Sequence, residues 1–175
     1  KKDGSNRYCI DFRALNNVTV FDAEPMPRPD DLFNEVGSQS KYLTKIDLSK
    51  GYWQIPLSDA AKQLTAFSTE RGLFQFRVMP FGLQGAPATF SRLMRKVVAG
   101  MDNVHNYLDD WLVHTDSWEE HLVVLRDLFS RLRKAGLTAR PTKCQVGFPE
   151  LEFLGHMIGS GTMSPILDKI KALQE

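Results

Sequence analysis

Two helical hydrophobic patterns, separated by a strand-like stretch, constrain the fold of this chain more than any other feature. In the first, the apolar side chains recur at the spacing i, i+3, i+4, i+7 and i+8: Phe90, Leu93, Met94, Val97 and Val98. A first helical turn tolerates Pro87, and Gly100 can end the helix. We therefore expect an amphipathic helix over residues 86–100.

The second predicted helix runs from Ser117 to Gly136. Ser117 and Glu120 have the spacing of a capping box, in which both side chains bind backbone amides at the start of a helix. Gly136 is a typical residue just beyond a helix end. The side chains expected on the buried face are Leu122, Leu125, Phe129 and Leu132.

Strand patterns fill much of the remaining chain. They lie at residues 7–15, 41–48, 65–79, 143–148 and 151–159, and the third contains a turn at residues 70–72. Residues 22–32 form a connector, because repeated prolines prevent a regular element there. Strands that alternate with two helices predict an α+β fold, in which helices pack on a mostly antiparallel sheet.

Composition limits the classes of protein that this chain can belong to. With 175 residues, 42% of them hydrophobic, the chain can bury the core of a single domain. The formal net charge is +1, so nucleic acid would have to be bound by locally clustered positive charge. Cys9 and Cys144 are too few for a disulfide framework and favour a reduced, intracellular protein. No apolar run has the length of a membrane span, and the first residues read as the middle of a longer polypeptide.

Two adjacent carboxylates, Asp109 and Asp110, interrupt the strand-like residues 104–115 between the helices. An isolated pair of this kind is most often a solvated turn. Two neighbouring carboxylates repel unless a cation lies between them, and a divalent cation such as Mg²⁺ needs further oxygen ligands. Asp47, at the end of the predicted strand 41–48, is the candidate third carboxylate, although alone it reads as a solvated strand end.

Four segments in order resemble the reverse transcriptases of gypsy-type long-terminal-repeat retrotransposons, which are related to the retroviral enzymes. They are KIDLSKGYWQIPL, FRVMPFGLQGAPATFSRLM, YLDDWLVHT and EFLGHMIG, and KKDGSNRYCIDFRALN precedes them. The resemblance covers essentially the whole chain. It implies a right-hand polymerase of α+β class, with a palm of antiparallel sheet backed by helices and a largely β fingers subdomain. The implied divisions are fingers at 1–22 and 55–85, palm at 23–54 and 86–160, and the start of the thumb at 161–175.

The resemblance implies an RNA-directed DNA polymerase core, which adds deoxynucleotides to a primer 3′-hydroxyl by two-metal-ion nucleotidyl transfer. The implied cofactor is a pair of Mg²⁺ ions, with Mn²⁺ as a substitute. The implied catalytic residues and metal ligands are Asp47, Asp109 and Asp110, and the carbonyl of Leu48 is a further ligand. Tyr107 and Leu108 complete the active-site hairpin.

Further residues are implied to bind the nucleotide and the primer. The nucleotide-binding residues are Lys2, Arg7, Tyr52, Phe81 and Gly82, and the primer grip is Leu154 and Gly155. Lys2 and Arg7 would grip the triphosphate, as a guanidinium does with two parallel hydrogen bonds. Tyr52 would occupy the space that a ribose 2′-hydroxyl needs, and so select deoxynucleotides.

The implied partners are an RNA or DNA template with its primer, deoxynucleoside triphosphates, and the rest of a retroelement polyprotein: thumb, connection and ribonuclease H. No membrane partner is expected. The implied location is inside the cell, in the cytoplasm or in virus-like particles. An alternative interpretation is a truncated or domesticated copy that binds nucleic acid without polymerising. Without a thumb, we expect this stretch alone to be weakly active or inactive, because phosphate-contacting surface is missing.

Overall fold

The computed structural model describes residues 9–25, 36, 40–160 and 162–166. The chain divides into two compact units. Unit 1 consists of Lys1–Glu24 and Lys50–Phe90, and unit 2 of Pro25–Ser49 and Ser91–Glu175. Within the described residues, no helix is both long and apolar enough to cross a bilayer.

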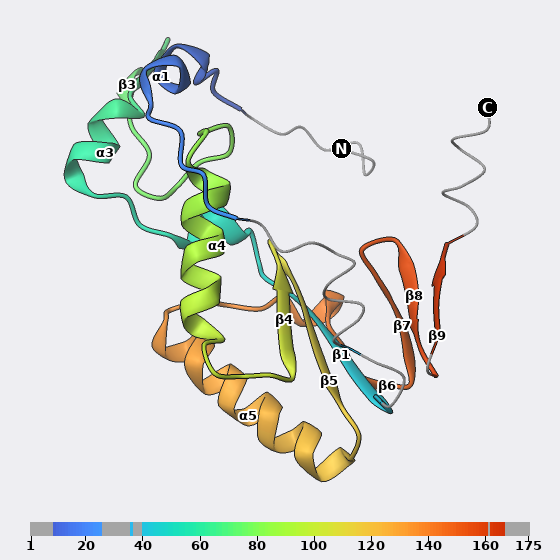
Figure 1. Cartoon of the computed structure of the whole chain (residues 1–175). Helices are drawn as coiled ribbons and strands as arrows, with labels where there is room; N and C mark the ends of the chain where they lie inside the picture. Colours follow the sequence, from blue (N-terminus) through green and yellow to red (C-terminus); the bar gives the residue numbers. More distant parts are fainter. Residues whose placement is uncertain (1–8, 26–35, 37–39, 161, 167–175) are drawn as a thin grey trace, which may run out of the picture. The chain divides into compact units, whose positions relative to one another are not determined.

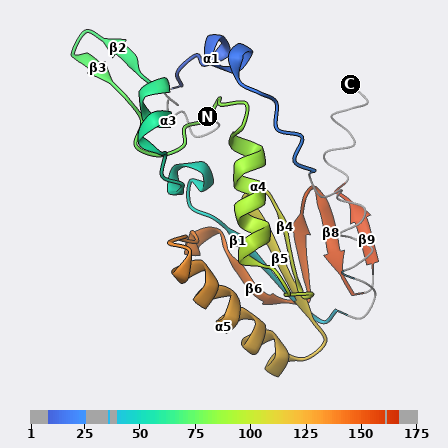
Figure 2. The same cartoon turned by 60° about the vertical axis from the view of Figure 1, so that its left-hand side comes forward.

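Unit 1 is built from short elements. They are α1 (Arg13–Val18), η1 (Gly51–Gln54), α3 (Asp59–Leu64), β2 (Phe67–Thr69), β3 (Gly72–Phe74) and the first residues of α4 (Ala86–Val97). β2 and β3 pair antiparallel as the predicted hairpin, visible in Figure 2. The expected helix over residues 86–100 is confirmed as α4, with an end three residues earlier.

The strand expected at residues 7–15 is wrong in its described part, because helix α1 begins at Arg13. The carboxylate of Asp11 accepts hydrogen bonds from the backbone nitrogen of Arg13 at 3.0 Å and from its guanidinium Nη2 at 2.6 Å. The amide of Asn16 then donates to the carbonyl of Phe12 at 2.8 Å. A side chain that captures the amide two residues ahead favours a turn over an extended strand, and hydrophobic alternation does not register this local competition.

Unit 2 contains two antiparallel sheets. The first has the order β4-β5-β1-β6 and consists of β1 (Tyr42–Asp47), β4 (Val104–Tyr107), β5 (Asp110–Thr115) and β6 (Gln145–Phe148). The second has the order β7-β8-β9 and consists of β7 (Glu150–Phe153), β8 (His156–Gly159) and β9 (Thr162–Pro165). Figure 1 shows both sheets together with α5 (Trp118–Lys134). The predicted α+β class with an antiparallel sheet is confirmed.

One face of the first sheet packs against α5 through a buried histidine. His121 bonds Thr44 Oγ1 through Nε2 at 2.6 Å and Thr115 Oγ1 through Nδ1 at 2.9 Å. Because the Thr115 hydroxyl donates to the Ser117 carbonyl, it accepts from Nδ1–H, and the neutral ring accepts from Thr44 through Nε2. Burial accordingly lowers the pKa of His121.

The buried stripe of α5 is therefore rotated from its predicted position. The buried side chains are His121, Leu125, Leu128 and Leu132. Leu125 and Leu132 were expected, whereas Leu122 is 36% exposed and Phe129 42% exposed. The hydrophobic pattern could not register the two hydroxyl partners that make this histidine compatible with burial, and so it placed Leu122 and Phe129 on the buried face.

The opposite face of the first sheet packs against the β7–β8 hairpin. An apolar cluster joins them, with Tyr107 and Leu154 packed against it: Val36, Leu43, Leu112, Leu151, Phe153 and Ile158. Successive strand residues point to opposite faces, so Lys45 and Asp47 lie on the same face as Leu43. This cluster therefore holds the hairpin beside the part of β1 that carries the candidate carboxylate.

Candidate active site

The strand register brings Asp47 next to the aspartate pair. Asp47 lies opposite Asp110 as the last pair of the β1–β5 ladder. The amide of Leu48 donates to the carbonyl of Asp109 at 3.1 Å, which continues the contact beyond the strand ends. Carboxylates 62 positions apart along the chain (109 − 47) thus meet at one end of the sheet.

A tight turn separates the two neighbouring aspartates. Tyr107 pairs with Asp110, so Leu108 and Asp109 form a two-residue connection between β4 and β5. Leu108 has φ 53°, a value that a leucine rarely adopts and that costs about 1–3 kcal/mol. Because Asp109 lies in this turn rather than in a strand, it is not bound to the face opposite Asp110 by strand alternation.

The surroundings of Asp109 disfavour its charged form. Burial raises its pKa, and the negative charges of Asp47 and Asp110 raise it further, while Lys143 opposes them. Its Oδ1 atom is buried and has no hydrogen-bond partner among the described residues. A buried polar atom without a partner destabilises a fold by about 1–3 kcal/mol, so this oxygen is an open ligand position.

Two lysines supply positive charge to the other carboxylates. Lys143 Nζ lies 3.4 Å from Asp47 Oδ2, and Lys45 Nζ lies 3.6 Å from Asp110 Oδ1. Lys143 ends the short helix η2 (Pro141–Lys143), and the preceding chain is fixed where the amide of Arg140 donates to the carbonyl of Asp47 at 2.8 Å. Sequence reasoning missed both lysines. Strand alternation could have placed Lys45 on the face of Asp47, but no sequence pattern pointed to Lys143.

The residues at this end of the sheet fit a divalent cation by donor chemistry. Carboxylate and carbonyl oxygens are the ligands that Mg²⁺ prefers. The unpartnered Oδ1 of Asp109 and the mutual repulsion of three carboxylates are both relieved by added positive charge. Within the described part of the chain, no group of three histidine, cysteine or carboxylate side chains is already arranged around a common metal position. The residues that would hold such an ion are the predicted ones: Asp47, Asp109, Asp110 and the carbonyl of Leu48.

Three of the residues implied to bind the nucleotide lie together in unit 1. The ring centroid of Tyr52 is 5.4 Å from that of Phe81 and 5.3 Å from that of Phe90. Gly82 has φ 94°, a backbone conformation that favours glycine. The side chain of Asn16, which sequence reasoning did not single out, donates to the carbonyl of Gly82 at 2.8 Å. Lys2 and Arg7 lie outside the described residues.

The predicted primer-grip residues form the tip of the β7–β8 hairpin. Leu154 and Gly155 connect the paired residues Phe153 and His156 and have φ 48° and 81°. Positive φ at both positions is the signature of a tight type I′ hairpin turn. A leucine at positive φ thus occurs at both candidate hairpins, Leu108 in the first and Leu154 in the second. Residues held in such conformations concentrate at functional sites.

A family profile described as reverse transcriptase (RNA-dependent DNA polymerase) matches residues 1–158. The retrovirus-related Pol polyprotein from transposon 297 of Drosophila melanogaster is 38% identical over 174 residues, which cover 97% of this chain and 16% of that protein. An RNA-directed DNA polymerase homolog of Oenothera berteroana is 46% identical over 127 residues, 70% of this chain and 89% of the relative. The chain thus spans less than a fifth of the length of the transposon polyprotein.

Solved structures give a similar result. The foamy viral protease-reverse transcriptase in complex with double-stranded DNA matches with a TM-score of 0.91 at 26% identity, over 100% of this chain and 31% of that chain. The same enzyme in complex with an RNA/DNA hybrid matches with a TM-score of 0.82 over 94% of this chain and 22% of that chain. At 24% identity the second match is a likeness of fold alone.

Proposed function

The chain belongs to the reverse transcriptase family, as its motifs predicted, and we propose that it is the catalytic core of an RNA-directed DNA polymerase from a gypsy-type retrotransposon. The observation that carries this proposal is the register that sets Asp47 opposite Asp110, with Asp109 in the adjoining turn. A decaying copy of such a gene would be under no constraint to keep three carboxylates in this arrangement.

In the proposed reaction, Asp47, Asp109, Asp110 and the carbonyl of Leu48 would hold two Mg²⁺ ions, with Mn²⁺ as a substitute. These ions, when bound, lower the pKa of the primer 3′-hydroxyl and neutralise the triphosphate and the leaving pyrophosphate. The strained Leu108 turn and the β1–β5 ladder hold the carboxylates at one edge in advance. Catalysis of this kind depends mostly on positioning and charge stabilisation, so a rigid carboxylate edge is what the chain itself contributes.

The proposed substrates are a primed RNA or DNA template and deoxynucleoside triphosphates. The foamy viral enzyme has been solved with an RNA/DNA hybrid and with double-stranded DNA, which supports the nucleic acid part of this proposal. Tyr52 would exclude the ribose 2′-hydroxyl. Its ring contacts with Phe81 and Phe90 would keep the Tyr52 ring in place when a ribonucleotide enters. Lys2 and Arg7 would bind the triphosphate, and Leu154 and Gly155 the primer end.

We also propose the division into fingers, palm and start of the thumb that the motifs predicted. The proposed location is the cytoplasm or virus-like particles. The match to a Pol polyprotein supports a longer parent polypeptide, and we propose that this polypeptide also contains a thumb, a connection and a ribonuclease H.

Primer extension by the polypeptide that contains this chain tests the proposal. On a primed RNA template, Asp109→Asn should lower the rate of deoxynucleotide addition by a factor of about a hundred or more, because an electrostatic ligand is lost. The matched control is Asp127→Asn, since Asp127 pairs with Arg131 on the surface of α5. Equal extension by Asp109→Asn and Asp127→Asn would refute the assigned role. Template binding without extension by the unaltered polypeptide would favour a domesticated nucleic-acid-binding copy instead.

A further inference from the structure

Lys45 occupies the one position of β1 between the apolar cluster and the carboxylates. Leu43, Lys45 and Asp47 alternate with residues that face α5, so the three side chains lie in a row on the same face. At one end of the row, Leu43 packs in the cluster that holds the β7–β8 hairpin. At the other end, Asp47 lies opposite Asp110. A side chain in the middle of this row can reach both groups.

The ammonium of Lys45 contacts both groups. Its Nζ lies 3.6 Å from Asp110 Oδ1 and 3.4 Å from the carbonyl oxygen of Glu152. It also lies 5.8 Å from the centroid of the Phe153 ring, within the range of a cation–π interaction. A lysine has three donors, so one ammonium can serve these partners at once. The side chain is only 22% exposed, which reduces the solvent screening that makes surface ion pairs weak.

The contacts fall on the two residues that precede the hairpin turn. Glu152 and Phe153 end β7, and Leu154 and Gly155 follow directly. Fixing the carbonyl of Glu152 and the ring of Phe153 therefore fixes the base of the turn. The same ammonium is paired with a carboxylate of the active-site edge, so the two hairpins share one charged link.

We propose that Lys45 is a positioning residue that holds the Leu154–Gly155 turn at a set distance from Asp110. The primer end is thereby placed correctly relative to the carboxylates of the active site. This inference rests on the proposed function, because it gives the turn the task of steadying the primer. Lys45 itself does not touch the reacting atoms in this account. A misplacement of about 1 Å between reacting groups can cost a factor of about a hundred in rate, so a link of this kind affects turnover without taking part in the chemistry.

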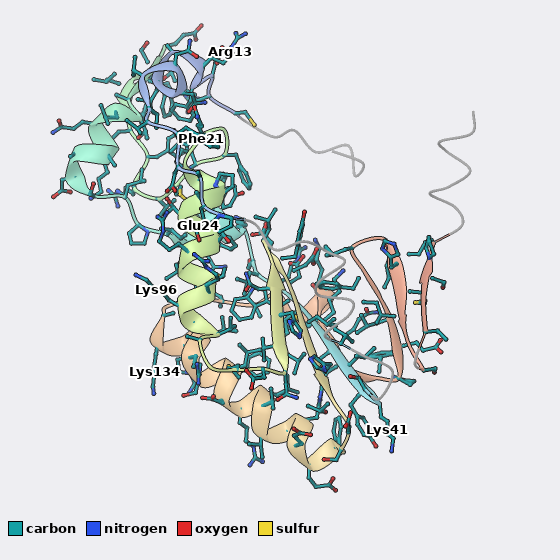
Figure 3. The ribbon with its side chains drawn as sticks, viewed as in Figure 1. Arg13, Phe21, Glu24, Lys41, Lys96 and Lys134 are labelled. Atoms are coloured by element: carbon teal, nitrogen blue, oxygen red, sulfur yellow. The ribbon has the colours of Figure 1, made fainter. Side chains whose placement is uncertain are left out.

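Two measurements on the full polypeptide test this role, and one of them needs neither metal nor substrate. The first is hydrogen exchange of the backbone amides of residues 150–159, measured without divalent ions. The second is single-nucleotide primer extension, which separates kcat from the KM for nucleotide. The variants are Lys45→Met, which keeps the length and removes the charge, and Lys45→Arg, which keeps the charge. Lys41→Met is the matched control, because Lys41 is an exposed lysine beside the start of the same strand (Figure 3).

Lys45→Met should speed exchange in residues 150–159 and lower kcat by a factor of about ten to a hundred, with little change in the KM for nucleotide. Lys45→Arg should recover most of both losses, and Lys41→Met should match the unaltered polypeptide. Exchange or kcat in Lys45→Met equal to that of Lys41→Met would overturn the proposal. If Lys45→Met does not fold, Lys45→Gln is judged by the same criteria. Failure of the unaltered polypeptide to extend primers would count against the proposed function, while the exchange result would still decide whether Lys45 anchors the turn.

Discussion

Replacing Asp109, whose charged form is disfavoured by its surroundings, should make the folded protein more stable and abolish polymerase activity. Asp109 carries a buried Oδ1 without a partner in the described chain, and the charges of Asp47 and Asp110 oppose its ionisation. Asp109→Asn keeps the shape of the side chain and removes the charge. The variant therefore relieves the repulsion among the three carboxylates without opening a cavity.

The expected gain follows from the loss of one negative charge. The charged form of Asp109 is disfavoured by burial and by the charges of Asp47 and Asp110. We take about 1 kcal/mol for removing this charge, the upper end for charge pairs that solvent still screens, because Asp109 is half-buried. For a chain of this length, that corresponds to a rise in Tm of about 2–4 °C. Thermal unfolding followed by circular dichroism in the presence of a chelator measures it. Adding Mg²⁺ should then raise the Tm of the unaltered protein, because a ligand that binds only the folded state stabilises it, and should raise that of Asp109→Asn less.

Asp127→Asn provides the comparison, since it removes a carboxylate that has an Arg131 partner on the surface. Its Tm should stay the same or fall slightly. The reasoning is refuted if Asp109→Asn unfolds at a lower temperature than Asp127→Asn in the chelator, because the charge of Asp109 would then not be a source of instability.

Three further predictions concern other residues. Tyr52→Ala should raise ribonucleotide incorporation relative to deoxynucleotide incorporation by about tenfold or more, measured with mixed nucleotides; an unchanged ratio would contradict the proposed role of Tyr52 in excluding the ribose 2′-hydroxyl. His121→Leu should lower the free energy of unfolding by about 2 kcal/mol, measured by urea titration, because it removes the hydrogen-bond partner of the buried Thr44 and Thr115 hydroxyls; unchanged stability would contradict this. Burial, and then the charge of His105, lowers the pKa of His114 from 6.5 to about 4. The unfolded chain therefore binds the extra proton first, and stability should fall as the pH drops from about 6.5 towards 4, by about 1–2 kcal/mol after allowance for partial exposure. His114→Gln should flatten this pH dependence, and an unchanged slope would contradict it.

Much of the arrangement follows from patterns that the chain carries locally. The helix at Ala86–Val97 and the helix at Trp118–Lys134 both show periodic apolar residues, and Ser117 caps the second by accepting from the amide of Glu120 at 3.2 Å. The hairpin at residues 104–115 follows from strand-like residues on both sides of the aspartate pair. If the strand that ends at Asp47 pairs antiparallel with this hairpin, its end can lie beside the aspartate pair, but the register that does this is an observation of the structure.

The parts that could not be predicted depend on contacts between distant residues or on one local polar group. Helix α1 replaces a strand because a single carboxylate, that of Asp11, captures the amide of Arg13. His121 enters the core because two threonines from separate strands meet its ring. Lys143 reaches Asp47 only because the chain leaving α5 pairs with the end of β1. None of these partners is visible from the sequence positions of the residues alone.

Counting bound ions tests the central claim most directly. Electron paramagnetic resonance can count Mn²⁺ on the full polypeptide in complex with a chain-terminated primer, an RNA template and the matching nucleotide. The three carboxylates gathered by the β1–β5 register predict about two ions for the unaltered polypeptide and fewer for Asp47→Asn. Equal occupancy in both would contradict the claim that Asp47, Asp109 and Asp110 together form the metal site.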